Sequence, residues 1–464
     1  MENMISTVTA VFQISVFVIM MYYFILGWAG IYRKKEKKNY KPKNKFAMIV
    51  AAHNEEVVIG KLIESMLNQD YPKELFDIFV IADNCDDNTA KVAREYGVYV
   101  YERFNKKEKG KGYALEWLFD KIFKMNNKYD AVAIFDADNL VSKNWCKEIN
   151  SKMEDGYKVV QGYIDSKNPN DSWIATSYSI AFWTQNRMFQ LARANIGLSN
   201  QIGGTGFAVN TEVLKELGWG ATCLTEDLEF TCKLILNGEK VGWAHDAIIY
   251  DEKPLTLKQS WVQRRRWMQG FTDVASRYFF KLLKKGIKTR KFFMLDCALY
   301  VIQPFLTLML GISAVLSFAQ SSAAKGLNIF LVSYLLGNSL FKILTVIQFL
   351  MTPLILKLDK KISSGLFIMF AFYSSNTFIL PIIAEHLDNY GVILLVDIAF
   401  NLVYFLAVRL ILGKEKLILF IRFLLYSLYT LTWIPITIEG MLRKNNKEWN
   451  PTKHVRNIEI CEVQ

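Results

Sequence analysis

The chain has 464 residues, of which 52% are hydrophobic and 22% charged, and its formal net charge is +12. A mean hydropathy of +0.14 is high for a chain with this many charges, which argues against a purely soluble protein and predicts membrane spans joined to a charged soluble part. Nucleic acid, an anionic membrane or phosphate ligands could each explain the positive charge. We favour a membrane, because Lys and Arg cluster beside apolar segments. The six cysteines show no CxxC spacing, which excludes the common zinc-site patterns.

The first apolar stretch, residues 8–32, is followed by a basic run that begins with Arg33, Lys34 and Lys35. About 25 helical residues reach roughly 37 Å, enough to cross a bilayer. A cleaved signal peptide would be shorter and would carry its charge before the apolar run. We therefore expect residues 1–33 to form a retained membrane span whose C-terminal end is cytoplasmic.

Between residues 34 and 255 the pattern alternates between strands and helices. Strands are predicted at 46–51, 77–82, 98–102, 131–135 and 240–250. Helices are predicted to begin near residues 54, 90, 111, 171 and 226, with a glycine loop at 201–207. This alternation is typical of an α/β domain with a mainly parallel, doubly wound sheet.

Residues 256–290 combine tryptophan, tyrosine and phenylalanine with lysine and arginine, which suits amphipathic helices at a membrane interface. The following region, 291–442, is predicted to hold four to five spans. The candidates are 295–319, 329–356, 365–384, 392–412 and 417–438, with loop 357–361 cytoplasmic and loop 385–390 outside. Five spans would put the basic tail, 443–464, outside, whereas the positive-inside tendency makes it cytosolic. Either one of the five is re-entrant or interfacial, or the two that flank Gly391 pack irregularly.

The stretch AVAIFDADNL, residues 131–140, ends a buried-type strand with Asp136 and Asp138. Side chains two apart on a strand share a face, so both carboxylates should leave the strand's tip together. In an open α/β sheet that tip is where ligands bind. Two neighbouring carboxylates can bind a Mg²⁺ or Mn²⁺ ion that lies between them and a phosphate. When this stretch is considered by itself, a strand followed by a solvent-exposed acidic turn explains it at least as well as a metal site.

Of three further polar segments, two fall at predicted strand ends and the third lies at the start of a predicted helix. Residues 52–56, AHNEE, place backbone amides and a helix start where an anionic ligand could bind, although a simple helix cap is the stronger reading alone. Asp83 ends the second strand and could accept hydrogen bonds from a base or ribose. KGKG, residues 109–112, is too short for a Walker loop, so it is either phosphate-neutralising or a mobile basic loop.

Two further segments could take part in catalysis. Thr225, Glu226 and Asp227 open a helix, and a carboxylate there could remove a proton from a hydroxyl nucleophile, although a capped helix is the plain alternative. QRRRW, residues 263–267, could bind a pyrophosphate through Arg266 and offer the Trp267 ring to a sugar. A basic amphipathic helix on anionic lipid competes with that interpretation.

Taken in order, AHNEE, IADNCDDNT, KGKGYAL, FDADN, GGTGF, TED and QRRRW resemble the motifs of the membrane-integrated family 2 glycosyltransferases of GT-A fold. That group includes cellulose, hyaluronan, chitin and poly-N-acetylglucosamine synthases. The resemblance implies an α/β GT-A domain, Rossmann-like and doubly wound, on the cytosolic side between transmembrane helices. It also implies inverting transfer from a nucleotide sugar, usually a UDP-sugar, with Mg²⁺ or Mn²⁺ as cofactor.

The resemblance also implies roles for individual residues. Asp227 would be the general base, with Glu226 beside it, and Asp138 would hold the metal. The donor nucleotide would be bound by Ala52, Asn54, Glu55, Asp83, Lys111, Asp136 and Arg266. The acceptor would be bound by Gly204, Thr205, Gln263 and Trp267.

The expected function is transfer of glucose or N-acetylglucosamine to a growing polysaccharide at the cytoplasmic face of a bacterial cell membrane. Its partners would be the donor, a glycan or lipid-linked acceptor and membrane lipid, but no nucleic acid. QxxRW argues for polymer synthesis, whereas the lack of a recognisable gating-loop motif argues for adding one or a few sugars to a lipid-linked acceptor. The second strand ends in ADNC, where many relatives have paired aspartates, so Asp83 would act alone. A membrane protein with a nucleotide-sensing domain and an inactive scaffold are the alternatives from other classes.

Overall fold

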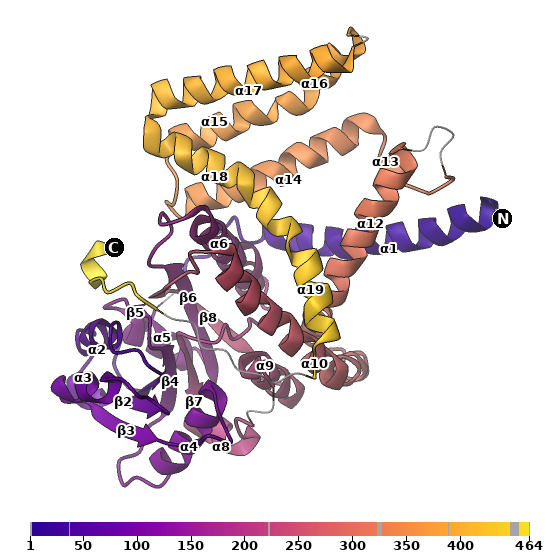
Figure 1. The fold of residues 1–464 in the computed structure, drawn as a ribbon. Coiled ribbons are helices and arrows are strands. Elements are labelled where there is room, and N and C mark those ends of the chain that lie inside the picture. Colours follow the sequence, from indigo (N-terminus) through magenta and orange to yellow (C-terminus); the bar gives the residue numbers. More distant parts are fainter. Residues whose placement is uncertain are drawn as a thin grey trace.

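A computed structural model of the chain describes residues 2–36, 38–220, 223–322, 327–387, 389–445 and 454–463. Residues 446–453 of the predicted basic tail lie outside the described residues, as does Lys37 in the basic run after the first apolar stretch. Figure 1 shows an α/β unit at the lower left, with long helices above it and to its right.

The described part of the α/β unit contains one eight-stranded sheet in the order β3-β2-β1-β4-β7-β6-β8-β5. The strands are β1 (Phe46–Ala52), β2 (Phe76–Asp83), β3 (Tyr99–Arg103), β4 (Ala131–Asp136), β5 (Leu140–Val141), β6 (Val159–Ser166), β7 (Phe207–Asn210) and β8 (Val241–Asp251). The first four pair in parallel, as the strand–helix alternation predicts. β7 runs antiparallel to both β4 and β6, and β5 runs antiparallel to β8. β6 and β8 pair in parallel. The sheet is therefore mixed, and the expectation of a mainly parallel sheet holds for β1–β4 and for the β6–β8 pair, but not where β7 and β5 join the sheet.

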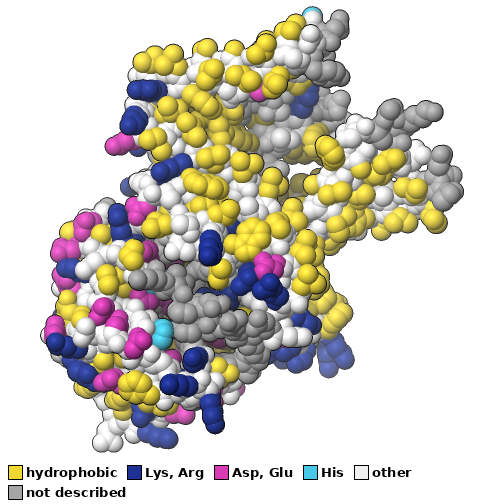
Figure 2. All heavy atoms as spheres, in the orientation of Figure 1, with side chains coloured by type: hydrophobic (Ala, Val, Ile, Leu, Met, Phe, Trp, Pro, Cys, Tyr) yellow, Lys and Arg dark blue, Asp and Glu magenta, His cyan; other side chains and the backbone are white. Residues whose placement is uncertain are grey.

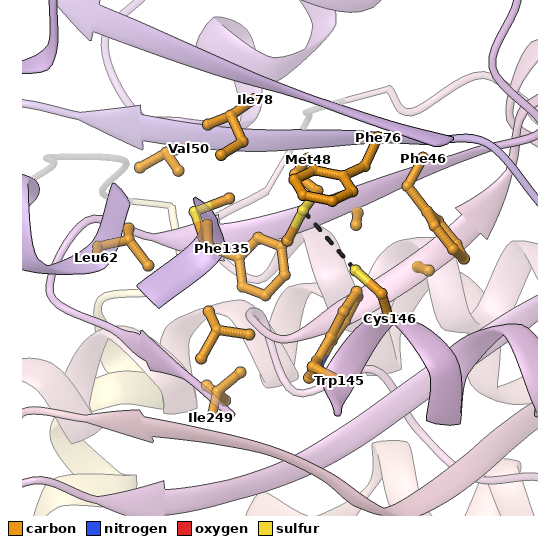
Figure 3. Packing of buried hydrophobic residues seen from close by; sticks show 14 of the residues in the cluster. Phe46, Met48, Val50, Leu62, Phe76, Ile78, Phe135, Trp145, Cys146 and Ile249 are labelled. Atoms are coloured by element: carbon orange, nitrogen blue, oxygen red, sulfur yellow. Dashed lines mark hydrogen bonds between the residues drawn. The ribbon is translucent and has the colours of Figure 1, made fainter. Parts of the chain in front are cut away.

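Helices cover both faces of the sheet. The helices α2 (Ile59–Leu67), α3 (Thr89–Glu95) and α5 (Trp145–Glu154) pack on one face, and α4 (Lys111–Ile122), α8 (Thr211–Leu217) and α9 (Glu226–Asn237) pack on the other. Along β1, Met48 and Val50 enter the first core and Ala47 and Ile49 the second, because strand side chains alternate between faces. Figure 3 shows the first core, where Phe135 packs edge-on against Trp145 at 4.8 Å between ring centroids.

A long helix with a π-helical middle connects the neighbouring strands β6 and β7. It comprises α6 (Trp173–Thr184), η2 (Gln185–Leu191) and α7 (Ala192–Asn195), and it matches the helix predicted over 171–194. Two of its arginines contact parts of the chain outside the α/β unit: Arg187 of η2 pairs with Asp359 at 2.7 Å, and Arg193 of α7 pairs with Asp296 at 2.7 Å. Both pairs are almost fully buried, so they hold the α/β unit against the apolar helices.

The remaining helices lie outside the α/β unit. They are α1 (Glu2–Trp28), α10 (Leu257–Thr289), α11 (Phe292–Val301), α12 (Gln303–Ser322), α13 (Ser333–Leu336), α14 (Asn338–Leu358), α15 (Ser364–Ser374), α16 (Asn376–Glu385), α17 (Tyr390–Leu412), α18 (Lys414–Leu431) and α19 (Trp433–Leu442). Two short 3₁₀ turns, η1 (Lys73–Leu75) and η3 (Ile460–Glu462), complete the described elements.

Six stretches of the described chain are long and apolar enough to cross a membrane, one before the α/β unit and five after it. This number matches the sequence-based expectation. The first of the five begins at Gln303 rather than near residue 295, because α11 ends at Val301 as a separate short helix. In Figure 2 hydrophobic side chains dominate the helical part, whereas acidic and basic side chains are mixed over the α/β unit.

Candidate active site

A pocket opens at the carboxyl ends of β1, β2 and β4, where they meet α4, α10 and the segment 454–463. This edge is where open α/β sheets usually bind ligands. Several residues singled out from the sequence line it: Ala52, Glu55, Asp83, Lys111, Asp136, Asp138, Gln263 and Arg266. The fold therefore brings together side chains that are scattered over more than 200 residues of sequence.

The two aspartates of the 131–140 stretch reach the pocket by different routes. β4 ends at Asp136, and a turn carries Asp138, so the expectation that both leave one strand face is wrong in detail. The turn is held because the amide of Asp136 donates to Thr205 Oγ1 at 3.0 Å. Asp138 is buried, and its Oδ2 accepts a hydrogen bond from the amide of Glu252 at 2.9 Å.

Lys111 links the acidic turn to the glycine loop. It is the first residue of α4, after Gly110, whose φ of 111° lies in the region that favours glycine. Its Nζ pairs with the carboxylate of Asp136 and donates to the carbonyl of Gly204 at 2.7 Å. The residue is thus held in place on a helix, which argues against the mobile-loop alternative for this position.

Asp83 and its neighbours form a second charged group at the pocket. Its Oδ1 accepts a hydrogen bond from Arg103 Nη1 at 2.7 Å, and both side chains are almost fully buried. Arg103 is the last residue of β3 and was not singled out from the sequence. Asn54 does not line the pocket; its Oδ1 accepts from the amide of Asp86, and its own φ is +57°.

The three consecutive arginines of QRRRW point in different directions from α10. Arg264 is buried with its guanidinium 4.2 Å from the Tyr429 ring centroid, and Arg265 pairs with Glu439 of α19 at 2.8 Å. Arg266 lines the pocket, and its Nε is buried without a hydrogen-bond partner among the described residues. Gln263 Oε1 accepts a hydrogen bond from Tyr178 at 2.7 Å.

Trp267 belongs to an aromatic cluster rather than to the described pocket lining. Its ring lies 6.0 Å from Tyr178, 6.3 Å from Phe182 and 6.4 Å from Trp433, measured between centroids. We call Tyr178, Trp267, Tyr429 and Trp433 the aromatic cluster. It joins α6, α10, α18 and α19 beside the pocket.

The carboxylates of Glu226 and Asp227 lie at the start of α9, near the glycine loop but outside the pocket lining. A Cβ added at Gly204 would lie 3.4 Å from Asp227 Oδ2, so the two residues are neighbours. Burial and the adjacent charge of Glu226 raise the pKa of Asp227 to about 7. A carboxylate with such a pKa can accept a proton near neutral pH.

The C-terminal segment contributes a residue that the sequence interpretation missed. His454 lines the pocket, with its Nδ1 2.8 Å from Glu55 Oε1 and its Nε2 3.9 Å from Asp138 Oδ2. Burial alone would lower the pKa of His454, but Asp138 and the hydrogen bond to Glu55 raise it to about 10. Burial raises the pKa of Asp138, but the positive charges of His454 and Lys167 outweigh burial and hold this pKa below its ordinary value.

Contacts with the α/β unit fix this segment. Glu252 accepts hydrogen bonds from the amides of Val455 and Arg456, and the carbonyl of Arg456 accepts from Lys167 at 3.0 Å. The segment was predicted only as part of a basic tail. One signal in the sequence could have drawn attention to His454: the chain has four histidines in all, so each can be considered as a candidate functional residue.

Comparison with known proteins identifies the α/β unit. Residues 42–270 match the model of the family described as "Glycosyltransferase like family 2". The chain carries a family 2 glycosyltransferase domain. This confirms the resemblance drawn from the ordered motifs.

Three curated relatives align with this domain. The probable glycosyltransferase YdaM of Bacillus subtilis is 29% identical over 265 residues, which cover 54% of this chain and 62% of that protein. The β-monoglucosyldiacylglycerol synthase of Trichormus variabilis is 28% identical over 262 residues, covering 53% of each chain. The poly-β-1,6-N-acetyl-D-glucosamine synthase of Staphylococcus aureus is 26% identical over 282 residues, covering 58% and 66%. The glycosyltransferase domain thus aligns with less than two thirds of each relative's length.

The fold is also similar to a solved mannosyltransferase of Pyrobaculum calidifontis, determined in complex with GDP-Man and Mn²⁺. The TM-score is 0.52 at 15% identity, and the match covers 78% of this chain and 98% of the other. The expected GT-A fold of the domain is thereby confirmed.

Proposed function

We propose that the protein is an inverting glycosyltransferase that moves glucose or N-acetylglucosamine from a UDP-sugar to a growing polysaccharide at the cytoplasmic face of a membrane. The observation that carries the proposal is the convergence of Asp136, Asp138 and Arg266 on one pocket of a family 2 domain. Carboxylates beside a guanidinium suit a nucleoside diphosphate bound together with a divalent cation.

The donor's diphosphate would lie between Arg266 and Asp138. Arg266 Nε, which has no hydrogen-bond partner among the described residues, would donate to an anionic oxygen of the diphosphate. Among the described residues, no three His, Cys, Asp or Glu side chains form a ready metal site. Mg²⁺ is commonly held by one or two carboxylates, with phosphate oxygens and water completing its shell. Asp138, with Asp136 beside it, fits such a site for Mg²⁺ or Mn²⁺, and the bound cation would offset charge on the departing diphosphate.

The nucleoside would be bound by the residues around Asp83. Asp83 and Glu55 line the same pocket as Lys111 and Arg266, so base and ribose contacts fit at one end and phosphate contacts at the other. Ala52 would pack against the nucleoside, and Asn54 would act through the turn that it bonds to. Lys111 would stabilise the negative charge of the diphosphate from the α4 side.

Asp227 would act as the general base. It would accept the proton of an acceptor hydroxyl while that oxygen bonds to the anomeric carbon and the bond from this carbon to the diphosphate breaks. UDP leaves on the opposite face, which inverts the anomeric centre. Glu226 would tune the pKa of Asp227, and Gly204 and Thr205 would line the acceptor approach beside it.

The acceptor has two candidate classes. The polymer reading places the end of a glycan near Gln263 and Trp267, and one relative is named for a poly-N-acetylglucosamine product. The second reading is transfer of one or a few sugars to a lipid or lipid-linked acceptor, and another relative is named for a glucosyldiacylglycerol product. The aromatic cluster would suit the apolar face of a sugar in both cases.

Membrane location is part of the proposal. The six apolar stretches support a multi-pass protein of the cell membrane, with the catalytic domain on the cytoplasmic side. The basic residues that follow α1, among them Arg33 and Lys38, support that orientation.

A donor screen tests the function. Purified full-length protein in nanodiscs would be supplied with Mg²⁺ or Mn²⁺, and release of UDP from UDP-glucose, UDP-N-acetylglucosamine and other nucleotide sugars would be measured. We expect metal-dependent turnover of one donor, lost in Asp227→Asn and kept in Glu212→Gln, whose carboxylate is exposed on α8. The size of the product would separate polymer from single addition.

The screen can also overturn the proposal. If no donor turns over, alone or with membrane lipid extract, the nucleotide-sensing alternative would take its place. Turnover that persists unchanged in Asp227→Asn would remove Asp227 from its role as base.

A further inference from the structure

The last two helices, α18 and α19, form a stretch apolar enough to cross a membrane, yet contacts along its length reach the catalytic side. In α18, Arg422 Nη1 donates to the carbonyl of Asn170 at 2.8 Å. At the junction between the helices, Thr432 Oγ1 accepts from Arg264 at 2.9 Å. Near the end of α19, Glu439 accepts from Trp261 at 2.7 Å.

These contacts are incompatible with a transmembrane course for this stretch. From Arg422 to Arg443 an α-helix rises about 32 Å, which is about the thickness of the hydrocarbon core. A spanning helix would therefore put its two ends on opposite sides. Instead, Gln269 of α10 donates to the carbonyl of Arg443 at 2.9 Å, so both ends contact the domain or its interfacial helix.

Helices α1 and α14 show a different arrangement, in which the chain after each of them contacts the catalytic domain. The chain just after α1 contacts Arg187, which donates to the carbonyls of Gly30 and Ile31. The chain just after α14 contacts the same residue through Asp359. Towards its other end α1 meets the segment before α13, where the amide of Phe330 donates to Thr9. In Figure 1, α15 and α17 run side by side, whereas α18 and α19 descend obliquely from their left-hand end toward α10.

The second half of α18–α19 has a distinct apolar outer face. Leu428, Leu431, Ile438 and Leu442 are 57%, 59%, 45% and 82% exposed. At 100° per residue they fall on one side, and the buried Tyr429 and Ile436 fall on the other. Charged residues bracket the stretch, with Lys414 and Lys416 at its start and Arg443 and Lys444 after its end.

We propose that α18–α19 lies in the plane of the membrane and docks its outer face into the headgroup–acyl boundary of the leaflet on the catalytic side. The occupant is lipid, because the face continues the exposed apolar surface of α12, α14 and α17 and is bracketed by basic residues that suit headgroups. The chain then crosses five times, through α1, α12, α14, α15–α16 and α17.

Five crossings put the C-terminal segment on the catalytic side. This agrees with the contact of His454 with Glu55 and resolves the odd number of predicted spans after the domain. The arrangement also puts the aromatic cluster at the leaflet surface, because Trp433 of α19 stacks on Trp267 at an interplanar angle of 23°. The inference rests on the proposed membrane location, but not on the identity of donor or acceptor.

Depth measurements on the full-length protein in liposomes test the inference. Spin labels would be attached at Leu428→Cys, Leu431→Cys and Ile438→Cys, with Leu402→Cys and Val403→Cys in the middle of α17 as controls, in a Cys85→Ala, Cys461→Ser background. We expect the three α18–α19 labels at one shallow depth, about 5–10 Å below the headgroups. The two controls should lie near the bilayer centre, roughly 15 Å deep.

Sidedness provides a second readout. Lys414→Cys and Lys444→Cys should react with an impermeant maleimide from the same side of sealed vesicles, and His386→Cys from the other side. Labels at residues 428–438 that pass through the bilayer centre would overturn the inference, as would reaction of residues 414 and 444 from opposite sides. Water-exposed labels, or cross-linking of these positions into dimers, would overturn lipid as the occupant. Shallow labels at the α17 controls would instead refute the proposed membrane location.

Discussion

Three neighbouring arginines on α10 have different partners, because successive helical residues point about 100° apart. Arg264 lies between the Tyr429 and Trp433 rings, with its guanidinium 4.2 Å and 4.9 Å from their centroids. Arg265 pairs with Glu439. Arg266 is the member of the three that lines the pocket, and its Nε has no partner among the described residues, so it is the one placed to bind a donor.

Replacing Arg266 should therefore impair catalysis far more than replacing its neighbour. We expect Arg266→Ala to lower kcat about 100-fold or more, because it removes a preorganised positive group from the departing diphosphate. Arg266→Lys should recover part of the loss, since it keeps the charge but not the planar fork. Steady-state kinetics would measure both, with Arg265→Ala as the matched control expected within a few-fold of wild type. Equal losses in the two alanine variants would contradict a specific role for Arg266.

The pH dependence of transfer should follow Asp227. Its pKa is raised to about 7 by burial and by Glu226, and the base acts only when deprotonated. Activity should therefore rise with pH through this region and level off above it. Glu226→Gln removes a neighbouring negative charge, which makes ionisation of Asp227 easier and should move the inflection to lower pH. An inflection that stays in place, or moves upward, would show that Asp227 does not control the profile.

Helix α10 connects the candidate base to the membrane-side helices. A Cβ at Gly270 would lie 2.8 Å from the Cβ of Thr225, which directly precedes Glu226 and Asp227. A Cβ at Gly440 of α19 would lie 2.6 Å from the Cβ of Met268, also on α10. The same helix thus contacts the base segment and α19 at very short range, and small residues at both crossings make this possible.

Enlarging Gly270 should displace the base segment. We expect Gly270→Ala to destabilise the fold by about 1–3 kcal/mol through overpacking and to lower kcat more than it changes donor KM. Gly286→Ala is the matched control, since a Cβ there would meet the flexible end of Leu295, far along α10 from the base segment. Thermal unfolding and kinetics would separate the two effects. A loss of stability without loss of kcat in Gly270→Ala would mean that the crossing does not position Asp227.

The C-terminal segment ties the end of the molecule to its first half. Its His454 contacts Glu55, which lies 399 residues earlier, and Arg456 pairs with Asp171 at 3.3 Å. Because the intervening helices must return the chain to the pocket, the arrangement of the apolar helices and the composition of the pocket depend on each other.

Removing the His454 side chain should weaken donor binding. It lines the pocket and places a positive charge beside Glu55 and Asp138, so its loss would leave these two carboxylates facing the anionic diphosphate without that charge. We expect His454→Ala to raise donor KM about tenfold or more, and Cys461→Ser, an exposed change in the same segment, to leave it near wild type. Calorimetric titration with UDP would check the binding step directly. Unchanged affinity in His454→Ala would remove this residue from the donor site.

Local patterns were enough to predict several parts of the molecule. The strands β1, β2, β3, β4 and β8 differ from the predicted ranges by at most one residue at each end, because runs of buried apolar residues bounded by polar turns are visible over short windows. The number of long apolar stretches was also predictable, since span length depends on composition alone. The ordered motifs from residue 52 to residue 267 indicated the family before any fold was available.

Contacts between distant segments were decided only by the tertiary structure. The sheet inserts β7 between β4 and β6 because hydrogen bonding between strands depends on partners far apart in sequence. The contact of His454 with Glu55 joins residues that are 399 positions apart in the chain. The three arginines of QRRRW point in different directions, and α18–α19 stays beside the domain, because of contacts between α10 and these helices. Composition alone does not distinguish these residues or helices from their neighbours. The sequence by itself thus determined the family, five of the eight described strands, the long apolar stretches and the candidate residues. Which of those residues meet, and which apolar helices pack beside the catalytic domain, depended on long-range packing that no local pattern encodes.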